Sequence, residues 1–154
     1  MHVLEREIVI NAPSEKVWGF LATPANLDRL TPPSLKFRIL SPVPDQMYDG
    51  LTILYEIGIP LFGSWRWLTE IKHIVDGQSF VDEQRLGPYR FWYHYHRIEP
   101  LENDRTRMID RVLYQLPFGP LGELVHAFRV RAMLAQIFEY RAGVLEEIFN
   151  EPKN

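Results

Sequence analysis

Two histidines one residue apart, His94 and His96, stand within the aromatic stretch FWYHYH at positions 91–96. Residues two apart on a β-strand point to the same side of a sheet, so both imidazoles would face one space. Such a pair can bind a metal ion, move protons near neutral pH, or take part in a structural hydrogen-bond network. The question is which other side chains the fold brings to them.

Carboxylates accompany the pair, because Asp82 precedes it and Asp110 follows it on separate predicted strands. A metal ion would need further ligands, and the remaining histidines, His2, His73 and His126, belong to other elements. We therefore expect no bound metal and no cofactor. A histidine that a carboxylate orients can instead act as an acid or base in an aldol-type cyclisation, a dehydration or a hydrolysis.

The composition is that of a folded domain. The 154 residues are 46% apolar and 24% charged, which predicts one domain over residues 1–154. The net charge of -3, with scattered Lys and Arg, offers no basic surface for nucleic acid. The absence of cysteine excludes disulfides and thiolate sites, and no apolar run approaches the roughly 18 residues of a membrane span. We expect a cytoplasmic protein, and the composition does not indicate an oligomeric state.

The apolar pattern predicts the elements that position the histidines. Period-2 alternation predicts a strand over residues 4–10, and proline and apolar spacing then predict two short helices that begin near Pro13 and Pro24. Six further strands are predicted at 35–39, 52–59, 65–75, 80–86, 89–98 and 106–116. Short turns between them indicate antiparallel pairing. Apolar residues at helical spacing predict one long helix over 121–149, in which Gly143 offers a bend.

These elements form an α+β architecture, in which a curved seven-stranded antiparallel sheet surrounds a long C-terminal helix. A sheet that wraps a helix leaves a space between them, where ligands bind. The strand at 106–116 shows which face is inward, because Arg107 and Arg111 share one face and Asp110 stands on the other. Applied to each strand, this rule predicts a cavity lined by Tyr55, Trp67, Asp82, Gln84, Trp92, His94, His96, Asp110 and Tyr114.

Such a lining favours binding of a small amphipathic or aromatic molecule, with Trp67 and Trp92 stacking on it. An alternative is a cofactor-independent cyclase, dehydratase or hydrolase, for which His94, His96 and Asp110 are the candidate catalytic residues. A third interpretation is that the polar groups only satisfy one another. The stretch LPFGPLGEL at 116–124 is either a lid over the cavity mouth or a plain turn into the helix.

The element order and three stretches, INAPSEKVWGFL, DEQRLGPYRFWYHYHRIEP and DRVLYQLPFGPLGEL, resemble the SRPBCC superfamily. This superfamily includes START lipid-transfer domains, polyketide cyclase and dehydrase proteins, and the major birch pollen allergen. More narrowly, the chain is similar to bacterial single-domain members, some of which are labelled cell division inhibitors. The resemblance implies a helix-grip fold with a deep cavity. It implies little about the ligand, because this fold serves carriers, receptors and enzymes alike.

Overall fold

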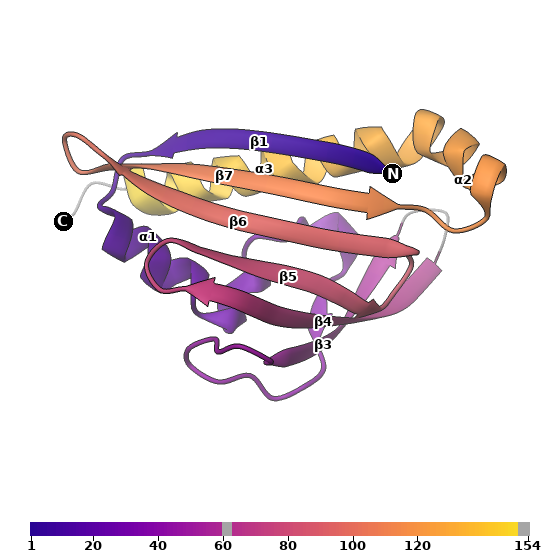
Figure 1. The fold of residues 1–154 in the computed structure, drawn as a ribbon, viewed down its shortest axis with the longest axis horizontal. Helices are drawn as coiled ribbons and strands as arrows, with labels where there is room; N and C mark the ends of the chain where they lie inside the picture. The colour runs from indigo at the N-terminus through magenta and orange to yellow at the C-terminus, as the bar shows by residue number, and fades with distance from the viewer. Residues whose placement is uncertain (60–62, 151–154) are drawn as a thin grey trace.

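The structure, a computed structural model, describes residues 1–59 and 63–150. Its strands form one seven-stranded antiparallel sheet in the order β1-β7-β6-β5-β4-β3-β2 (Figure 1). The strands are β1 His2–Ile10, β2 Arg38–Ile39, β3 Thr52–Ile59, β4 Gly63–Val75, β5 Ser79–Leu86, β6 Phe91–Leu101 and β7 Arg105–Gln115. From β2 to β7 each strand pairs with its neighbour in sequence, and β1 closes the far edge by pairing with β7.

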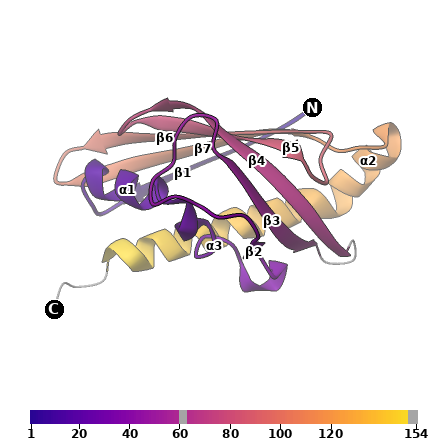
Figure 2. The same cartoon turned by 90° about the horizontal axis from the view of Figure 1, so that it is seen from below.

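The helices cover one face of this sheet. They are α1 Ser14–Leu21, the 3-10 turns η1 Pro24–Leu27 and η2 Pro33–Leu35, α2 Gly119–Val125, a π-helical turn at His126–Val130, and α3 Arg131–Asn150. Figure 2 shows α1 and α3 on the same side of the sheet, with α2 at the opposite end of the molecule from α1. This arrangement is the predicted helix-grip α+β fold.

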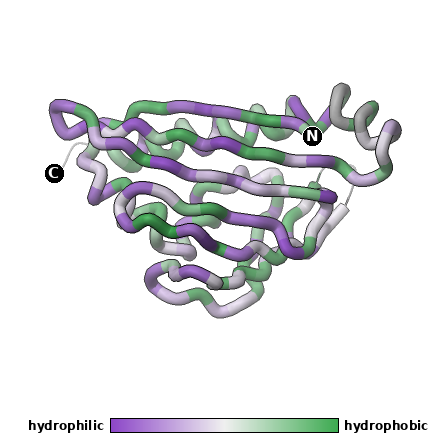
Figure 3. Tube along the Cα trace, viewed as in Figure 1, coloured by the Kyte–Doolittle hydropathy of each residue, from purple (hydrophilic) through white to green (hydrophobic). Residues whose placement is uncertain are grey.

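Alternate burial along β6 and β7 confirms the predicted faces of these strands. Trp92, His94 and His96 are buried, whereas Tyr93 and Tyr95 on the other face are half-buried. The same alternation holds from Met108 to Tyr114 on β7. Figure 3 shows the alternation of polar and apolar residues along the strands. The inner face packs against α3, so the aromatic and histidine side chains of β6 belong to the interior.

Two predictions near the N-terminal third were wrong in detail. The second short helix is a single 3-10 turn, η1, rather than about two turns of α-helix. The strand predicted at 35–39 begins only at Arg38, because η2 and a left-handed Lys36, with φ of 45°, come first. Pro32 and Pro33 come after η1 and fix the backbone at the start of η2, and this turn occupies the first residues of the predicted strand.

The C-terminal helix changes direction at a place that the sequence did not indicate. The irregularity is the π-helical turn at His126–Val130, whereas Gly143 lies within the exposed side of α3. A π turn inserts one extra residue, which rotates the face of the following helix relative to the preceding one. Leu134, Phe138 and Leu145 thereby face the sheet and are buried.

Among the described helices, none is long and apolar enough to cross a membrane.

Candidate functional site

An inner pocket of about 160 Å3 lies between the sheet and α3. Most of its wall is apolar, supplied by β3, β4, α1, the segment after α1, and α3. One acidic and three basic side chains interrupt this wall, which are Asp82 from β5, His94 and His96 from β6, and Arg141 from α3. The pocket therefore has a group of acidic and basic side chains on a mainly apolar surface, as is usual for sites that orient a small molecule.

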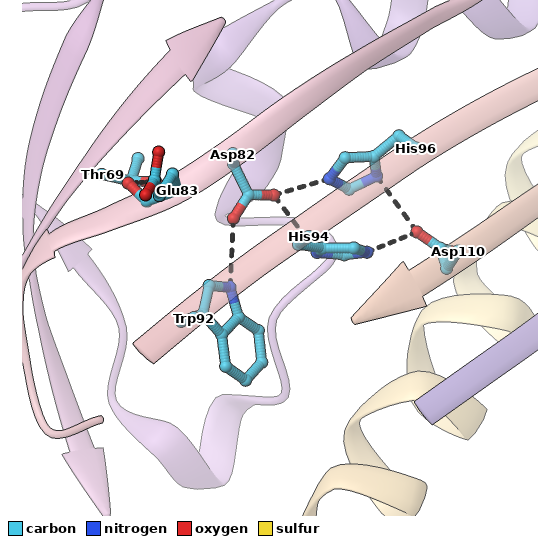
Figure 4. Close-up of polar contacts among 7 residues, drawn as sticks. All are labelled: Thr69, Asp82, Glu83, Trp92, His94, His96 and Asp110. Atoms are coloured by element: carbon cyan, nitrogen blue, oxygen red, sulfur yellow. Dashed lines mark hydrogen bonds and ion pairs between the residues drawn. The ribbon is translucent and has the colours of Figure 1, made fainter. Parts of the chain in front are cut away.

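Two aspartates and two histidines form a closed ring of contacts at this polar region (Figure 4). Asp82 Oδ2 lies 2.6 Å from His96 Nε2 and 3.2 Å from His94 Nδ1. Asp110 Oδ1 lies 2.8 Å from His94 Nε2 and 3.0 Å from His96 Nδ1. The last contact is not aligned as a hydrogen bond, so His96 Nδ1 contacts Asp110 only as an ion pair.

Strand register explains this ring. Asp82 is directly opposite His94 in the β5–β6 pair, and His96 is directly opposite Asp110 in the β6–β7 pair. Residues opposite one another on the same face of a sheet have Cβ atoms only about 5 Å apart. Each aspartate therefore reaches the histidine opposite it and the one two residues along.

Aromatic side chains fix the ring from its sides. Trp92 Nε1 donates a hydrogen bond of 3.3 Å to Asp82 Oδ1. Phe80 stacks on the His96 imidazole, with 4.2 Å between ring centroids, and the His94 and His96 rings are 3.7 Å apart. Phe138 of α3 approaches His94 edge-on at 5.4 Å. These contacts hold the imidazoles in one orientation and exclude water from them.

The number of hydrogens limits the charge of the ring. All four imidazole nitrogens face carboxylate oxygens, and an ionised carboxylate only accepts hydrogen bonds. A neutral imidazole carries a hydrogen on only one nitrogen, so its other nitrogen would repel the nearby oxygen. Both contacts of His94 are attractive only when this histidine is positively charged, because each of its nitrogens lies against a different carboxylate.

The electrostatic shifts agree with this charge pattern. Burial alone would lower the pKa of His94, but the carboxylates of Asp82 and Asp110 outweigh burial and raise it. Burial alone would raise the pKa of Asp82, but His94 and His96 hold it far below its usual range. For Asp110 the opposing groups are Arg141 and the same histidines, which keep its pKa well below normal against the effect of burial. These directions favour charged carboxylates and a positively charged His94 in the folded protein.

The raised pKa of His94 predicts that part of the stability is lost in alkaline solution. Its contribution is complete below the unfolded pKa of about 6.5 and disappears as pH rises through the higher folded pKa. The aspartates, with lowered pKa values, contribute fully above about pH 4. Asp82, Asp110 and His96 contact His94, and Arg141 acts on Asp110 through its charge.

The measurement is the free energy of unfolding of the wild type and of His94→Gln by denaturant titration. We expect the advantage of the wild type to be larger near pH 5.5 than near pH 9, because only the lower pH keeps the imidazolium. An advantage that is equal at both pH values would contradict a charged His94 in the folded protein.

A metal ion fits this ring poorly as it stands. In the described part of the chain, Asp82, His94 and His96 present ligand atoms within 4.8 Å of one another, a two-histidine-one-carboxylate set. Two ligands that share an ion at about 2.1 Å lie roughly 3 Å or more apart. Asp82 Oδ2 and His96 Nε2 are 2.6 Å apart, which is a hydrogen-bond distance. A metal would have to separate them.

The structure places the nine predicted cavity residues in three different positions. Those in the wall of the inner pocket are Tyr55, Trp67, Asp82, Trp92, His94 and His96. Asp110 and Tyr114 are buried behind this wall, Asp110 against the imidazoles. Gln84 lies near the end of β5, and its amide reaches the turn to β6, where it donates to Tyr89 O at 2.7 Å and accepts from Tyr89 N at 3.2 Å. It holds the turn and does not line the pocket.

Sequence reasoning missed Arg141, which lines the inner pocket from α3. Its guanidinium lies 5.9 Å from the centre of the Phe138 ring, and its Nε is buried without a hydrogen-bond partner. A signal was available, because Arg141 falls three residues after Phe138 and seven after Leu134, on the apolar side of the helix. A charged residue at such a position is a site candidate.

An outer pocket of about 510 Å3 adjoins the inner one. Both have Ile59, Tyr89 and Met133 in their walls. The remaining wall of the outer pocket comes from Trp65 of β4, Pro88, the segment between β7 and α2, α2, the π-helical turn and the start of α3. The stretch 116–124, predicted as a lid or a turn, therefore lies at this pocket. Phe118 in this stretch and Phe128 in the π-helical turn are largely exposed.

Comparison with known proteins identifies the fold. No protein-family model and no curated protein matches the chain. A START superfamily protein from Mycobacterium smegmatis is 17% identical, with 98% of this chain and 99% of that chain covered and a TM-score of 0.70. A protein from Chromobacterium violaceum is 15% identical, with 99% and 100% covered and a TM-score of 0.74.

The Zhui aromatase/cyclase from a Streptomyces species is 13% identical, with 97% of this chain and 93% of that chain covered and a TM-score of 0.74. Identities this low show a shared fold alone. The sequence resemblance to the SRPBCC superfamily is thereby confirmed at the level of fold. The narrower similarity to proteins labelled cell division inhibitors stays a prediction.

Proposed function

Because the chain shares the helix-grip fold of START superfamily proteins, we propose that it binds a small amphipathic or aromatic molecule between its sheet and α3. The observation that carries this proposal is the pair of adjoining pockets, whose walls are mainly apolar and include one group of acidic and basic side chains in the inner pocket. Apolar walls with a few convergent polar groups are the usual composition of a small-molecule site.

The pocket sizes support a ligand with a compact end and a larger body. The inner pocket, about 160 Å3, is close to the roughly 150 Å3 that holds a single benzene in a protein core. The outer pocket, about 510 Å3, lies within the roughly 300–1,000 Å3 of small-molecule sites. A ligand with one ring in the inner pocket would extend past Tyr89 into the outer pocket.

Aromatic side chains supply stacking surfaces along this path. Tyr55 and Trp67 stack with 5.7 Å between ring centroids, and Trp92 meets Trp67 edge-on at 5.2 Å. Tyr89 lies 4.8 Å from Trp92. Such rings favour planar ligands through offset stacking and edge contacts. Burial raises the pKa of Tyr55 well above normal, with Asp82 and Tyr89 adding to the effect, so its hydroxyl stays a hydrogen-bond donor.

A second candidate function is cofactor-independent cyclisation, dehydration or hydrolysis at the same place. The favouring observation is that His94 and His96 line the inner pocket while carboxylates orient them. Because every imidazole nitrogen lies against a carboxylate, a bound substrate would have to displace one of these contacts before a histidine transfers a proton to or from it. The Tyr55 hydroxyl could then stabilise an oxyanion. Turnover of a bound compound that disappears in His96→Ala separates this candidate from binding alone.

The experiment that tests binding uses the neutral naphthalene dye prodan as probe. We expect saturable binding by fluorescence, together with a rise in melting temperature, because a ligand that binds only the folded state stabilises it. Native mass spectrometry of freshly purified protein is expected to show a bound compound carried from the host.

Two variants on one strand make the test specific. Ile57 lines the inner pocket from β3, whereas Leu54 lies on the opposite face of the same strand. We expect Ile57→Trp to lower the affinity for prodan about tenfold or more by filling the pocket, and Leu54→Trp to change it less than about twofold. Absence of saturable binding in the wild type, or equal losses in both variants, would contradict the proposed site.

A further inference from the structure

Arg141 is a charged group in the inner pocket without a partner. It makes no hydrogen bond and no ion pair to any described residue, although its Nε is buried and its side chain is half-buried. The face of Phe138 supports the guanidinium from one side. A guanidinium stays charged at any physiological pH and offers five N–H donors in a rigid plane. Donors that are removed from water and left without acceptors destabilise the free protein.

The carboxylate on the pocket wall is not available to Arg141 or to a ligand. Asp82 Oδ1 accepts the hydrogen bond of Trp92 Nε1, and its Oδ2 contacts both histidines. Asp110 acts on Arg141 only through its charge and lies behind the wall, where the imidazoles occupy its Oδ1. The protein's own donors therefore use both oxygens of Asp82 and Oδ1 of Asp110.

A second residue of the same wall, Trp67, also has a buried donor without an acceptor. Trp67 Nε1 is buried without a hydrogen-bond partner, and the residue is 6% exposed. By contrast, in the described part of the chain no oxygen atom of the inner pocket wall is buried without a partner. The unpaired buried polar atoms of residues in the pocket wall are thus nitrogens, so this wall has an excess of donors over acceptors.

From these contacts we propose that the ligand is a planar organic acid, whose carboxylate or similarly charged oxygen pairs with Arg141 while its rings fill the apolar wall. This inference rests on the proposed binding function and adds the sign of the ligand's charge. A carboxylate matches the planar fork of a guanidinium and makes the stronger, charge-assisted kind of hydrogen bond. A cationic ligand would meet the positive charge of Arg141 without a free carboxylate to offset it.

The experiment compares two probes that share one ring system and differ in charge, naphthalene-2-carboxylate and (naphthalen-2-ylmethyl)ammonium. Isothermal titration calorimetry at about pH 7 is expected to give at least about tenfold tighter binding for the carboxylate. Arg141→Met, which keeps the length and apolar character of the stem, is expected to remove most of this preference. Arg131→Met is the matched control, because Arg131 lies on the exposed side of the same helix, and it should leave the preference unchanged.

The outcomes separate this inference from the proposed function. Equal affinities for the two probes, or a preference for the carboxylate that survives in Arg141→Met, would overturn the assignment of an acid while the binding function stands. If neither probe binds but prodan does, the assignment is likewise overturned. If none of the three probes binds, the proposed function itself fails, and the charge of the ligand with it. The wild-type comparison needs no variant to fold.

Discussion

Replacement of Asp110 by asparagine is expected to lower the free energy of unfolding by about 3–5 kcal/mol near neutral pH. The substitution keeps the size of the side chain but removes one of two negative charges that balance the imidazoles of His94 and His96. It also removes the carboxylate whose pKa Arg141 lowers through its charge. Buried positive charges without compensation are among the most destabilising changes known in protein interiors.

Denaturant titration and thermal melting would measure this effect. For a chain of this size the expected loss corresponds to a melting temperature lower by about 10 °C. Asp76→Asn is the matched control, since Asp76 also accepts a side-chain hydrogen bond, from Trp18 Nε1 at 2.9 Å, but lies exposed. We expect a loss below about 1 kcal/mol for the control. A similar small loss for Asp110→Asn would mean that the ring is not an ion-pair network.

Replacement of Gly122 by alanine is expected to destabilise the protein by about 1–3 kcal/mol and to distort the outer pocket. A Cβ at this position would overlap the carbonyl oxygen of Pro117 and lie 3.2 Å from Leu116 Cβ. Both neighbours belong to the chain between β7 and α2, so α2 must move away from it. Gly122, Leu116 and Pro117 all line the outer pocket, and the affinity for prodan should fall with the stability.

A second glycine gives the opposite expectation. A Cβ on Gly143, in the interior of α3, would meet nothing within 4 Å. Gly143→Ala should therefore raise the free energy of unfolding by about 0.5–1 kcal/mol, the usual gain from a better helix former. Urea titration and prodan affinity, measured on both variants, form the test. If Gly122→Ala were as harmless as Gly143→Ala, the close approach of α2 to Pro117 would be refuted.

The sequence predicted the inward faces of β6 and β7 because period-2 alternation depends only on local geometry. Charged residues such as Arg107 and Arg111 identified the outer face, and the burial of His94 and His96 followed. The pattern of alternation does not contain the register between strands. That register, which sets Asp82 opposite His94 and His96 opposite Asp110, creates the ring.

Other parts of the site depend on packing that no local pattern contains. Gln84 has the parity of Asp82, yet a register shift between β4 and β5 follows Leu68, and its amide instead fixes the chain at Tyr89. Arg141 reaches the inner pocket because the π-helical turn sets the rotation of α3. Backbone conformation at a helical irregularity is a tertiary outcome, so the sequence predicted the helix but not its turn.

The pairing of β1 with β7 affects how the chain reaches its folded state. His2 pairs with Tyr114 and Ile10 with Thr106, so the first strand waits for roughly a hundred further residues to be synthesised before its partner exists. Contacts between residues so far apart in sequence form slowly, because the intervening chain must first be ordered. Val3 and Val9 on this strand remain exposed even after pairing. On the ribosome, the hairpins from β3 to β7 can assemble in order, while β1 stays an unpaired strand whose backbone groups are open to other nascent chains until the last pairing step.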